Sequence, residues 1–185
     1  TRSGISIENA SLVTLDDIVV PSAGNWAVKA TGSEAAITNS IFTGNGFGGI
    51  SADSSSLTIS DTDINDNTSY GVYGISGSTI DIDASNIIGT LSSGSADTQD
   101  GIAAYIESNS ILLINASDLS GSAIFSTYSV NSSTFLTDSI TGQTTFGAIW
   151  AEGTGELSLS GVTIDEAPGY GIIAQITGAV NIENT

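Results

Sequence analysis

A repeat of about 22 residues runs through the whole chain and constrains its fold more than any other feature. An apolar marker residue recurs 21–24 residues apart, with one gap of 32, at Leu15, Ile37, Ile59, Ile82, Ile114, Phe135, Leu159 and Ile182. A second apolar residue follows most markers by five positions, and a third precedes each by nine to twelve. Gly, Ser, Asn and Asp separate these short alternating stretches. Each repeat is therefore predicted to contain three short β-strands.

A single repeat of this size cannot bury its apolar face alone, but stacked copies can. Each strand then hydrogen-bonds to the equivalent strand of the next coil, at about 4.8 Å per coil. The pattern predicts an all-β parallel β-helix (β-solenoid) of about eight coils with three short strands per coil, roughly 38 Å long. We expect one domain over residues 1–185. An antiparallel sandwich also has evenly spaced strands, but the hairpin signal Asn-Gly occurs only at Asn45-Gly46.

Small residues recur at fixed places in the repeat and support this register. A hydroxyl residue stands three positions after four of the markers, at Ser40, Thr62, Ser85 and Ser117. We expect these hydroxyls to lie where the strand bends inward and to bond a neighbouring backbone group. The gap of 32 residues contains the stretch 89–100, which predicts an extra loop leaving the coil.

The charge balance excludes some partners. Arg2 and Lys29 stand against 20 acidic residues, which gives a formal net charge of −18. Such a surface repels nucleic acid and anionic lipid, and it attracts cations. No apolar run approaches the roughly 18 residues of a membrane helix, so no membrane insertion of this segment is expected. The first residues lack a signal-peptide layout, so we expect a mature or excised segment.

One stretch carries a resemblance to a known family. Phe42-x-x-Asn45 followed by Gly48-Gly49-Ile50 is similar to the FxxN and GGA(I/L/V) repeats of polymorphic outer-membrane and autotransporter-type surface proteins, and Ile64-x-x-Asn67 before Gly71-Val72 is a weaker copy. By its pattern the whole chain resembles the pectate-lyase-like superfamily of right-handed parallel β-helices. The resemblance implies right-handed coils and an extracellular or cell-surface location.

The catalytic inventory is poor. Pectate-lyase-like enzymes abstract a proton with Arg or Lys and neutralise the substrate with Ca²⁺ or further basic residues, whereas this chain has only Arg2 and Lys29 and no histidine. Its charge also repels an acidic polymer. Glycoside hydrolysis needs only two carboxylates, but the outward acids Asp53 and Glu152 are expected several coils apart. The balance leans toward a protein that is not an enzyme.

One acidic turn is a candidate cation site. Asp61, Asp63, Asn65 and Asp66 surround the inward Ile64 with carboxylate and amide oxygens. Ca²⁺ takes 6–8 such ligands, so we name these four residues as a possible calcium site. The segment lacks the glycine and closing glutamate of a calcium loop, and a solvated Asx-rich turn explains the same residues.

Outward aromatic residues form the candidate binding face. In-register stacking brings together Tyr73, Ile75, Tyr105, Phe125, Trp150 and Ile173. We predict Tyr73, Tyr105, Phe125 and Trp150 as ligand-binding residues, because exposed aromatics stack on sugars or anchor protein partners. The alternative is that the 89–100 loop, or another part of the parent protein, covers this face. Phe47 with Tyr70, and Phe146 with Tyr170, are expected to stack in pairs at a corner.

Together these features favour a non-enzymatic extracellular or cell-surface structural or adhesion protein. It is a candidate fibre or stalk subunit whose partner is itself, by head-to-tail stacking, or a surface glycan or protein. The alternative is a carbohydrate-binding or carbohydrate-active β-helix that uses its aromatic and acidic face. An ice-binding solenoid ranks lower, because the outward residues Thr58, Asp81, Leu113, Thr134 and Ser158 form no threonine array.

Overall fold

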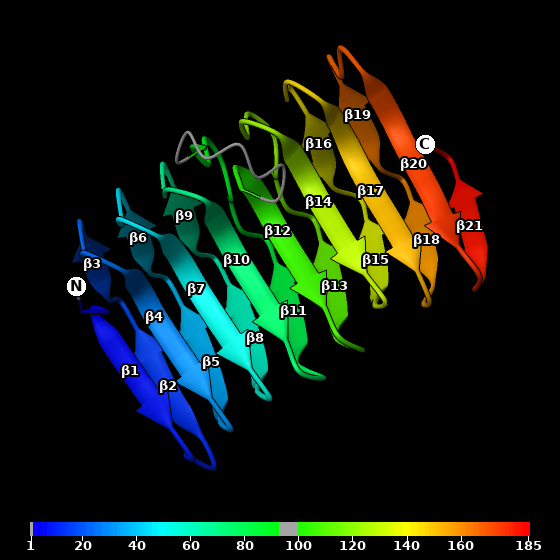
Figure 1. Ribbon diagram of the computed structural model, residues 1–185. Coiled ribbons are helices and arrows are strands. Elements are labelled where there is room, and N and C mark those ends of the chain that lie inside the picture. Colours follow the sequence, from blue (N-terminus) through cyan, green and yellow to red (C-terminus); the bar gives the residue numbers. More distant parts are fainter. Residues whose placement is uncertain (1, 93–99) are drawn as a thin grey trace.

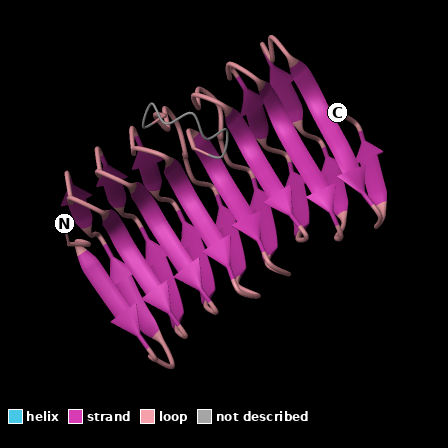
Figure 2. Ribbon diagram, viewed as in Figure 1, coloured by secondary structure: helices cyan, strands magenta, loops and turns pink. Residues whose placement is uncertain are grey.

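The computed structural model describes residues 2–92 and 100–185, and the regular elements in that part of the chain are all β-strands (Figure 2). They form a solenoid in which each strand lies beside its counterparts in the coils before and after it, with the two termini at opposite ends (Figure 1). The strand pairings in the described residues are parallel, as the repeat predicted.

Two long sheets form two sides of the solenoid. Sheet A has eight strands, in the order β1 (Ile5–Glu8), β4 (Trp26–Thr31), β7 (Gly48–Asp53), β10 (Tyr70–Ile75), β12 (Ile102–Glu107), β14 (Phe125–Val130), β17 (Gly147–Gly153) and β20 (Tyr170–Ile176). Sheet B also has eight, in the order β2 (Val13–Asp16), β5 (Glu34–Thr38), β8 (Ser56–Ser60), β11 (Thr79–Asp83), β13 (Ile111–Asn115), β15 (Ser133–Thr137), β18 (Leu157–Ser160) and β21 (Val180–Glu183).

The third side is narrower. It contains β3 (Val19–Pro21), β6 (Ile41–Thr43) and β9 (Asp63–Asn65), then β16 (Ile140–Gly142) and β19 (Thr163–Asp165). Isolated parallel bridges from Asp63 through Asn86 and Asp118 to Ile140 carry it across the two coils between these groups. The described chain thus makes seven three-sided coils and two sides of an eighth. The predicted all-β solenoid of about eight coils is confirmed.

The inward side chains form one apolar core along the axis. The predicted markers Ile37, Ile59, Ile82 and Ile114 are at most 2% exposed and pair in register from coil to coil. The Tyr70–Ile102 pair spans 32 residues and locates the insertion between β11 and β12. Ser92 Oγ donates to Asp100 Oδ1 at 2.9 Å, and residues 93–99 of the predicted loop lie outside the described residues.

Hydroxyl ladders hold the corners, as predicted for Ser40, Thr62, Ser85 and Ser117. At the corner after sheet B, each backbone N–H donates to the hydroxyl of the next coil, for example Thr62 N to Ser85 Oγ at 3.2 Å. The hydroxyl itself donates to the carbonyl two residues earlier, as Ser85 Oγ does to Asp83 O at 2.8 Å. A second ladder follows sheet A, at Ser33, Ser55, Ser78, Ser110 and Ser132. Both ladders bond the backbone where the sheets are interrupted.

Buried asparagines explain the Phe42-x-x-Asn45 motif. Asn67 is fully buried, its Nδ2 donates to Phe42 O at 2.9 Å, and its Oδ1 accepts from Asn45 N at 3.0 Å. Asn45 Oδ1 in turn accepts from Ala23 N at 2.8 Å. The two asparagines therefore supply backbone partners at the corner between the third side and sheet A.

The predicted register is wrong in the sixth coil and at the start of the fifth. Leu136, not Phe135, pairs with Ile114 and faces inward, and Thr141 replaces Ile140 on the third side. On sheet A the positions opposite Val72 are Ala104 and then Thr127, not Ile102 and Ile124. Thr134 is 1% exposed and faces inward, so it is not an outward residue of sheet B. Inward threonines and an outward phenylalanine reverse the usual apolar pattern here, while backbone pairing with the adjacent coils fixes the register.

Candidate functional site

A ladder of stacked aromatic rings covers the outer face of sheet A. Tyr73, Tyr105, Tyr128 and Trp150 occupy one register position of β10, β12, β14 and β17. Their ring centroids lie 5.2, 5.5 and 5.7 Å apart in succession, and neighbouring planes differ by only 10–13°. These distances slightly exceed the spacing of the coils, as offset stacking requires. We call these four residues the aromatic ladder.

Three of the four predicted face residues belong to this ladder, and Phe125 does not. Phe125 pairs with Ile102, three positions before Tyr128 in β14. Its ring meets Tyr128 at 5.5 Å and Trp150 at 5.6 Å, so it braces the ladder from the side. The prediction exchanged Phe125 for Tyr128 because it aligned Ile124 with Val72. Ile75 and Ile173 lie on sheet A as expected, although Ile75 is two positions beyond Tyr73.

A second row of aromatic side chains flanks the ladder. Trp26, Tyr70 and Phe125 share a register position with Gly48, Ile102, Gly147 and Tyr170. A Cβ atom at Gly48 would overlap the Trp26 ring, which lies across that glycine and stacks on Tyr70 at 6.1 Å. The expected contact between Phe47 and Tyr70 is present, with centroids 5.8 Å apart. Phe146 packs on Phe125 at 6.1 Å, rather than in the ring pair with Tyr170 that was predicted.

Two glutamates bind the outer edges of the ladder rings. Glu107 accepts from the hydroxyls of Tyr73 and Tyr105, at 3.1 and 3.0 Å on its two carboxylate oxygens. Glu152 accepts from the Tyr128 hydroxyl at 3.2 Å and from Trp150 Nε1 at 3.1 Å. Each carboxylate therefore links two successive coils. The sequence contains a signal for this arrangement in Tyr105-Ile-Glu107 and Trp150-Ala-Glu152, which sequence reasoning did not use.

Burial and the nearby carboxylate change the acidity of the ladder tyrosines. Desolvation by burial raises the pKa of Tyr73 and Tyr105 well above the usual tyrosine value, and the negative charge of Glu107 and the hydrogen bond to it raise both further. Both hydroxyls are therefore neutral donors at any physiological pH.

The ladder leaves little ring face open to a ligand. Tyr105 is 2% exposed and Tyr128 8%, although both lie on the outside of the solenoid. Their faces are covered by the rings of adjacent coils, and Phe125, at 3% exposure, covers one edge. A sugar stacks on an open ring face, and within the ladder the half-buried Tyr73 and Trp150 are the rings that could offer one in part. Tyr73, Tyr105, Phe125 and Trp150 as ligand-binding residues stay a prediction.

The predicted calcium residues lie on the β9 side of the third coil. Asp63 and Asn65 flank the buried Ile64 in β9, whereas Asp61 and Asp66 are corner residues with φ of 48° and 54°. Asp63 Oδ1 accepts from Asn86 Nδ2 at 2.8 Å, and Asn65 Oδ1 accepts from Ile88 N at 3.1 Å. Within residues 2–92 and 100–185 no group of three or more His, Cys, Asp or Glu side chains is placed to hold a metal. Calcium binding stays a prediction for this turn.

The outward acids do not form a hydrolytic pair. Asp53 is in the third coil and Glu152 in the seventh, and four coil spacings separate them by about 19 Å. Paired glycosidase carboxylates are about 5–9.5 Å apart. Glu152 is also engaged by the ladder. These two residues therefore cannot act on one glycosidic bond.

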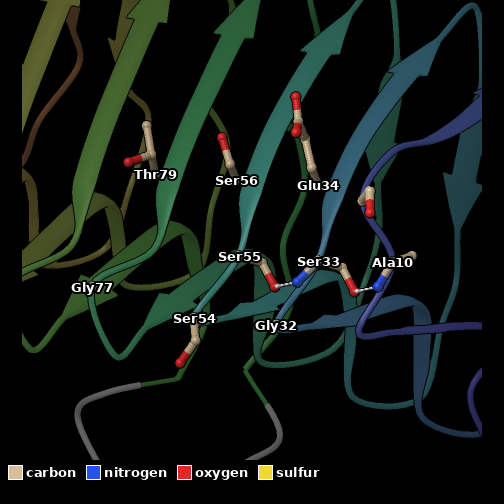
Figure 3. A pocket seen from close by; sticks show the side chains of 10 residues that line it. Ala10, Gly32, Ser33, Glu34, Ser54, Ser55, Ser56, Gly77 and Thr79 are labelled. Atoms are coloured by element: carbon tan, nitrogen blue, oxygen red, sulfur yellow. Dashed lines mark hydrogen bonds between the residues drawn. The ribbon is translucent and has the colours of Figure 1, made fainter.

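A shallow groove runs along the corner between sheets A and B (Figure 3). It has a volume of about 400 Å³ and is lined by small residues, with Glu34 as its acid. Ser33 Oγ and Ser55 Oγ accept from Ala10 N and Ser33 N in the corner ladder (Figure 3). The Ser33 and Ser55 hydroxyls at the base of the groove are therefore already hydrogen-bonded to the backbone.

The family comparison agrees with this architecture. The family described as "right handed beta helix region" matches residues 3–155, most of the chain. The protein belongs to the right-handed β-helix family. The right-handed turn that the resemblance implied is thereby confirmed for this β-helix. No curated protein and no solved structure matches it significantly. Within the described residues, no α-helix is long and apolar enough to span a membrane.

Proposed function

We propose that this β-helix is a non-enzymatic structural or adhesion module of an extracellular or cell-surface protein. The observation that carries the proposal is the aromatic ladder, which spans β10 to β17 and ties successive coils through Glu107 and Glu152. Ring stacking adds to the sheet hydrogen bonds along the same axis and resists bending and separation of the coils. A stalk or spacer requires this property.

The surface supports the same role. A net charge of −18 keeps a long solenoid soluble and repels nucleic acid and anionic lipid. The resemblance of the Phe42-x-x-Asn45 stretch to autotransporter-type repeats agrees with a position outside the cell. Self-association by head-to-tail stacking is part of the proposal, because the strand edges by which successive coils pair could also pair coils of two copies. Cations such as Ca²⁺ would lower the repulsion between such acidic copies.

Carbohydrate binding is the second candidate, and the half-buried Trp150 at the end of the ladder favours it. A sugar could stack on the part of this indole that Tyr128 does not cover. The first candidate has more support, because the inner ladder rings are closed to stacking.

One set of measurements separates the two candidates. Electron micrographs of the purified chain at increasing concentration should show short rods that lengthen by end-to-end addition. A glycan array should show no binding that depends on Trp150, when the wild type is compared with Trp150→Ala and with Phe135→Ala on sheet B as the matched control. Glycan binding lost only in Trp150→Ala would establish the carbohydrate role. Polysaccharide cleavage abolished by Glu152→Gln would overturn the non-enzymatic role.

A further inference from the structure

The sixth coil has a different interior from its neighbours. Its central inward residues are Thr127 on sheet A, Thr134 on sheet B and Thr141 on the third side. In the seventh coil the same positions hold Ile149, Leu157 and Ile164. In the fifth coil, sheet B holds Leu112 at this position. A hydroxyl-lined layer therefore interrupts an otherwise apolar core.

The hydroxyls of this layer are buried without a protein partner. Thr127 and Thr134 are 1% exposed and Thr141 is fully buried, and no group within the described residues bonds the Oγ1 atom of any of the three. A threonine hydroxyl inside a protein normally has a hydrogen-bond partner, because burying it unpaired is costly. Two other buried hydroxyls, Thr90 Oγ1 and Ser122 Oγ, also have no protein partner within the described residues, whereas Thr62 and Ser85 in the corner ladder are bonded.

The side chains of this layer are smaller than those at the same positions of the seventh coil. Thr134 and Thr141 each have one side-chain atom fewer than the leucine or isoleucine at the matching position of the next coil. The three side chains come from three different sides of the coil, so they converge on its axis. Buried water requires a site of this kind, with polar groups on several sides and space for one molecule.

We propose that the sixth coil encloses an internal water site held by Thr127, Thr134 and Thr141. Each hydroxyl donates to or accepts from the water, and about three such bonds are typical of a buried water molecule. The apolar residues of the seventh coil, Ile149, Leu157 and Ile164, close one side of the site.

The test uses threonine-to-valine changes in the full chain, because valine keeps the shape and removes the hydroxyl. With water present, Thr134→Val removes one of its partners, and the melting temperature should fall by about 2–4 °C. The triple variant Thr127→Val, Thr134→Val and Thr141→Val needs no water, so its loss should be much smaller than the sum of the three single losses. Thr62→Val, in which a bond to protein is lost, is the matched control and should lower the melting temperature without such compensation.

Two other patterns of melting temperature would overturn the proposal. Dry, unpaired hydroxyls would make each single valine variant more stable, and the three gains would add. Losses that add would instead mean that each hydroxyl has its own protein partner. A measurement on the wild type does not depend on folding of the variants: water-selective nuclear magnetic resonance should transfer magnetisation from a long-lived water to the threonine methyl groups. The absence of that transfer would also refute the site.

Discussion

The coils turn their corners through one or two residues in the left-handed region of the backbone. Such residues recur at all three corners, for instance Asn39 (φ 49°), Asp61 (φ 48°) and Asp138 (φ 47°) after sheet B. Asn, Asp and Gly tolerate this conformation best, which explains why these residues separate the strands. At two places after sheet B the residue is alanine, at Ala84 (φ 47°) and Ala116 (φ 48°).

Ala84→Gly should therefore stabilise the protein. Glycine removes the clash of a Cβ atom in the left-handed region, and this gain exceeds the extra freedom of glycine in the unfolded chain. We expect the free energy of unfolding to rise by about 1 kcal/mol in urea denaturation. Ala36→Gly, in the middle of β5, is the control and should lower it by about 0.5–1 kcal/mol. Equal losses in both variants would contradict this account.

The buried asparagines act at the same scale, and Asn67→Ala should be costly. The change removes the buried bonds from Asn67 Nδ2 to Phe42 O and from Asn45 N to Asn67 Oδ1. We expect a loss of about 3 kcal/mol in the free energy of unfolding. The exposed Asn86 makes its side-chain bond to Asp63, so Asn86→Ala should cost about 0.5 kcal/mol or less. Similar losses for both asparagines would show that Asn67 is not part of a buried network.

At the scale of the element, each of the strands β10, β12, β14 and β17 of sheet A contributes one ring of the aromatic ladder as well as backbone hydrogen bonds. β12 contributes Tyr105, which stacks on Tyr73 on one side and Tyr128 on the other. Its neighbours cover it almost completely, so removal of the ring leaves a gap within the ladder.

Tyr105→Ala should cost about 3–5 kcal/mol of stability, as truncation of a buried aromatic does. Tyr105→Phe keeps the ring and loses only the bond to Glu107, so it should cost about 1–2 kcal/mol. Thermal unfolding followed by circular dichroism measures both. If the phenylalanine variant were as unstable as the alanine variant, the hydrogen bond rather than the stacking would hold the ladder.

The strand elements also show how far sequence reasoning reaches. The period predicted the coils, and Ser40, Thr62, Ser85 and Ser117 were assigned correctly because a hydroxyl at a corner has a local cause. The ladder was only partly predicted, since the assignment of Phe125 or Tyr128 depends on the register of β14. In that coil the inward residue Thr127 gives no apolar signal. The roles of Glu107 and Glu152 depend on side-chain orientation between coils, which a repeat pattern does not contain.

For the whole molecule, the ladder makes stability fall at alkaline pH. The pKa of Tyr73 and Tyr105 is raised in the folded state, mainly by burial, whereas in the unfolded chain tyrosine titrates near pH 10. Below about pH 10 both states hold these protons, so this contribution is fully present. Above it the unfolded state loses protons first, and stability falls as pH rises toward the folded pKa.

Urea denaturation from pH 8 to 12 should therefore show a steady free energy of unfolding that declines above about pH 10. The variant with both Tyr73→Phe and Tyr105→Phe is the control, and its decline should be shallower. An identical decline in the double variant would assign the effect to other groups.

The stacked rings also give the solenoid distinctive fluorescence and circular dichroism. Tyr73, Tyr105 and Tyr128 lie nearly parallel, close together and next to an indole at Trp150. The electronic transitions couple when rings lie this close together. Excitation energy absorbed by the tyrosines is therefore transferred to the tryptophan, which emits it as fluorescence. The folded chain should therefore fluoresce as tryptophan when tyrosine is excited, with a strong near-ultraviolet dichroic signal. Both signals depend on contact between successive coils, so their loss would report the separation of coils without any added label.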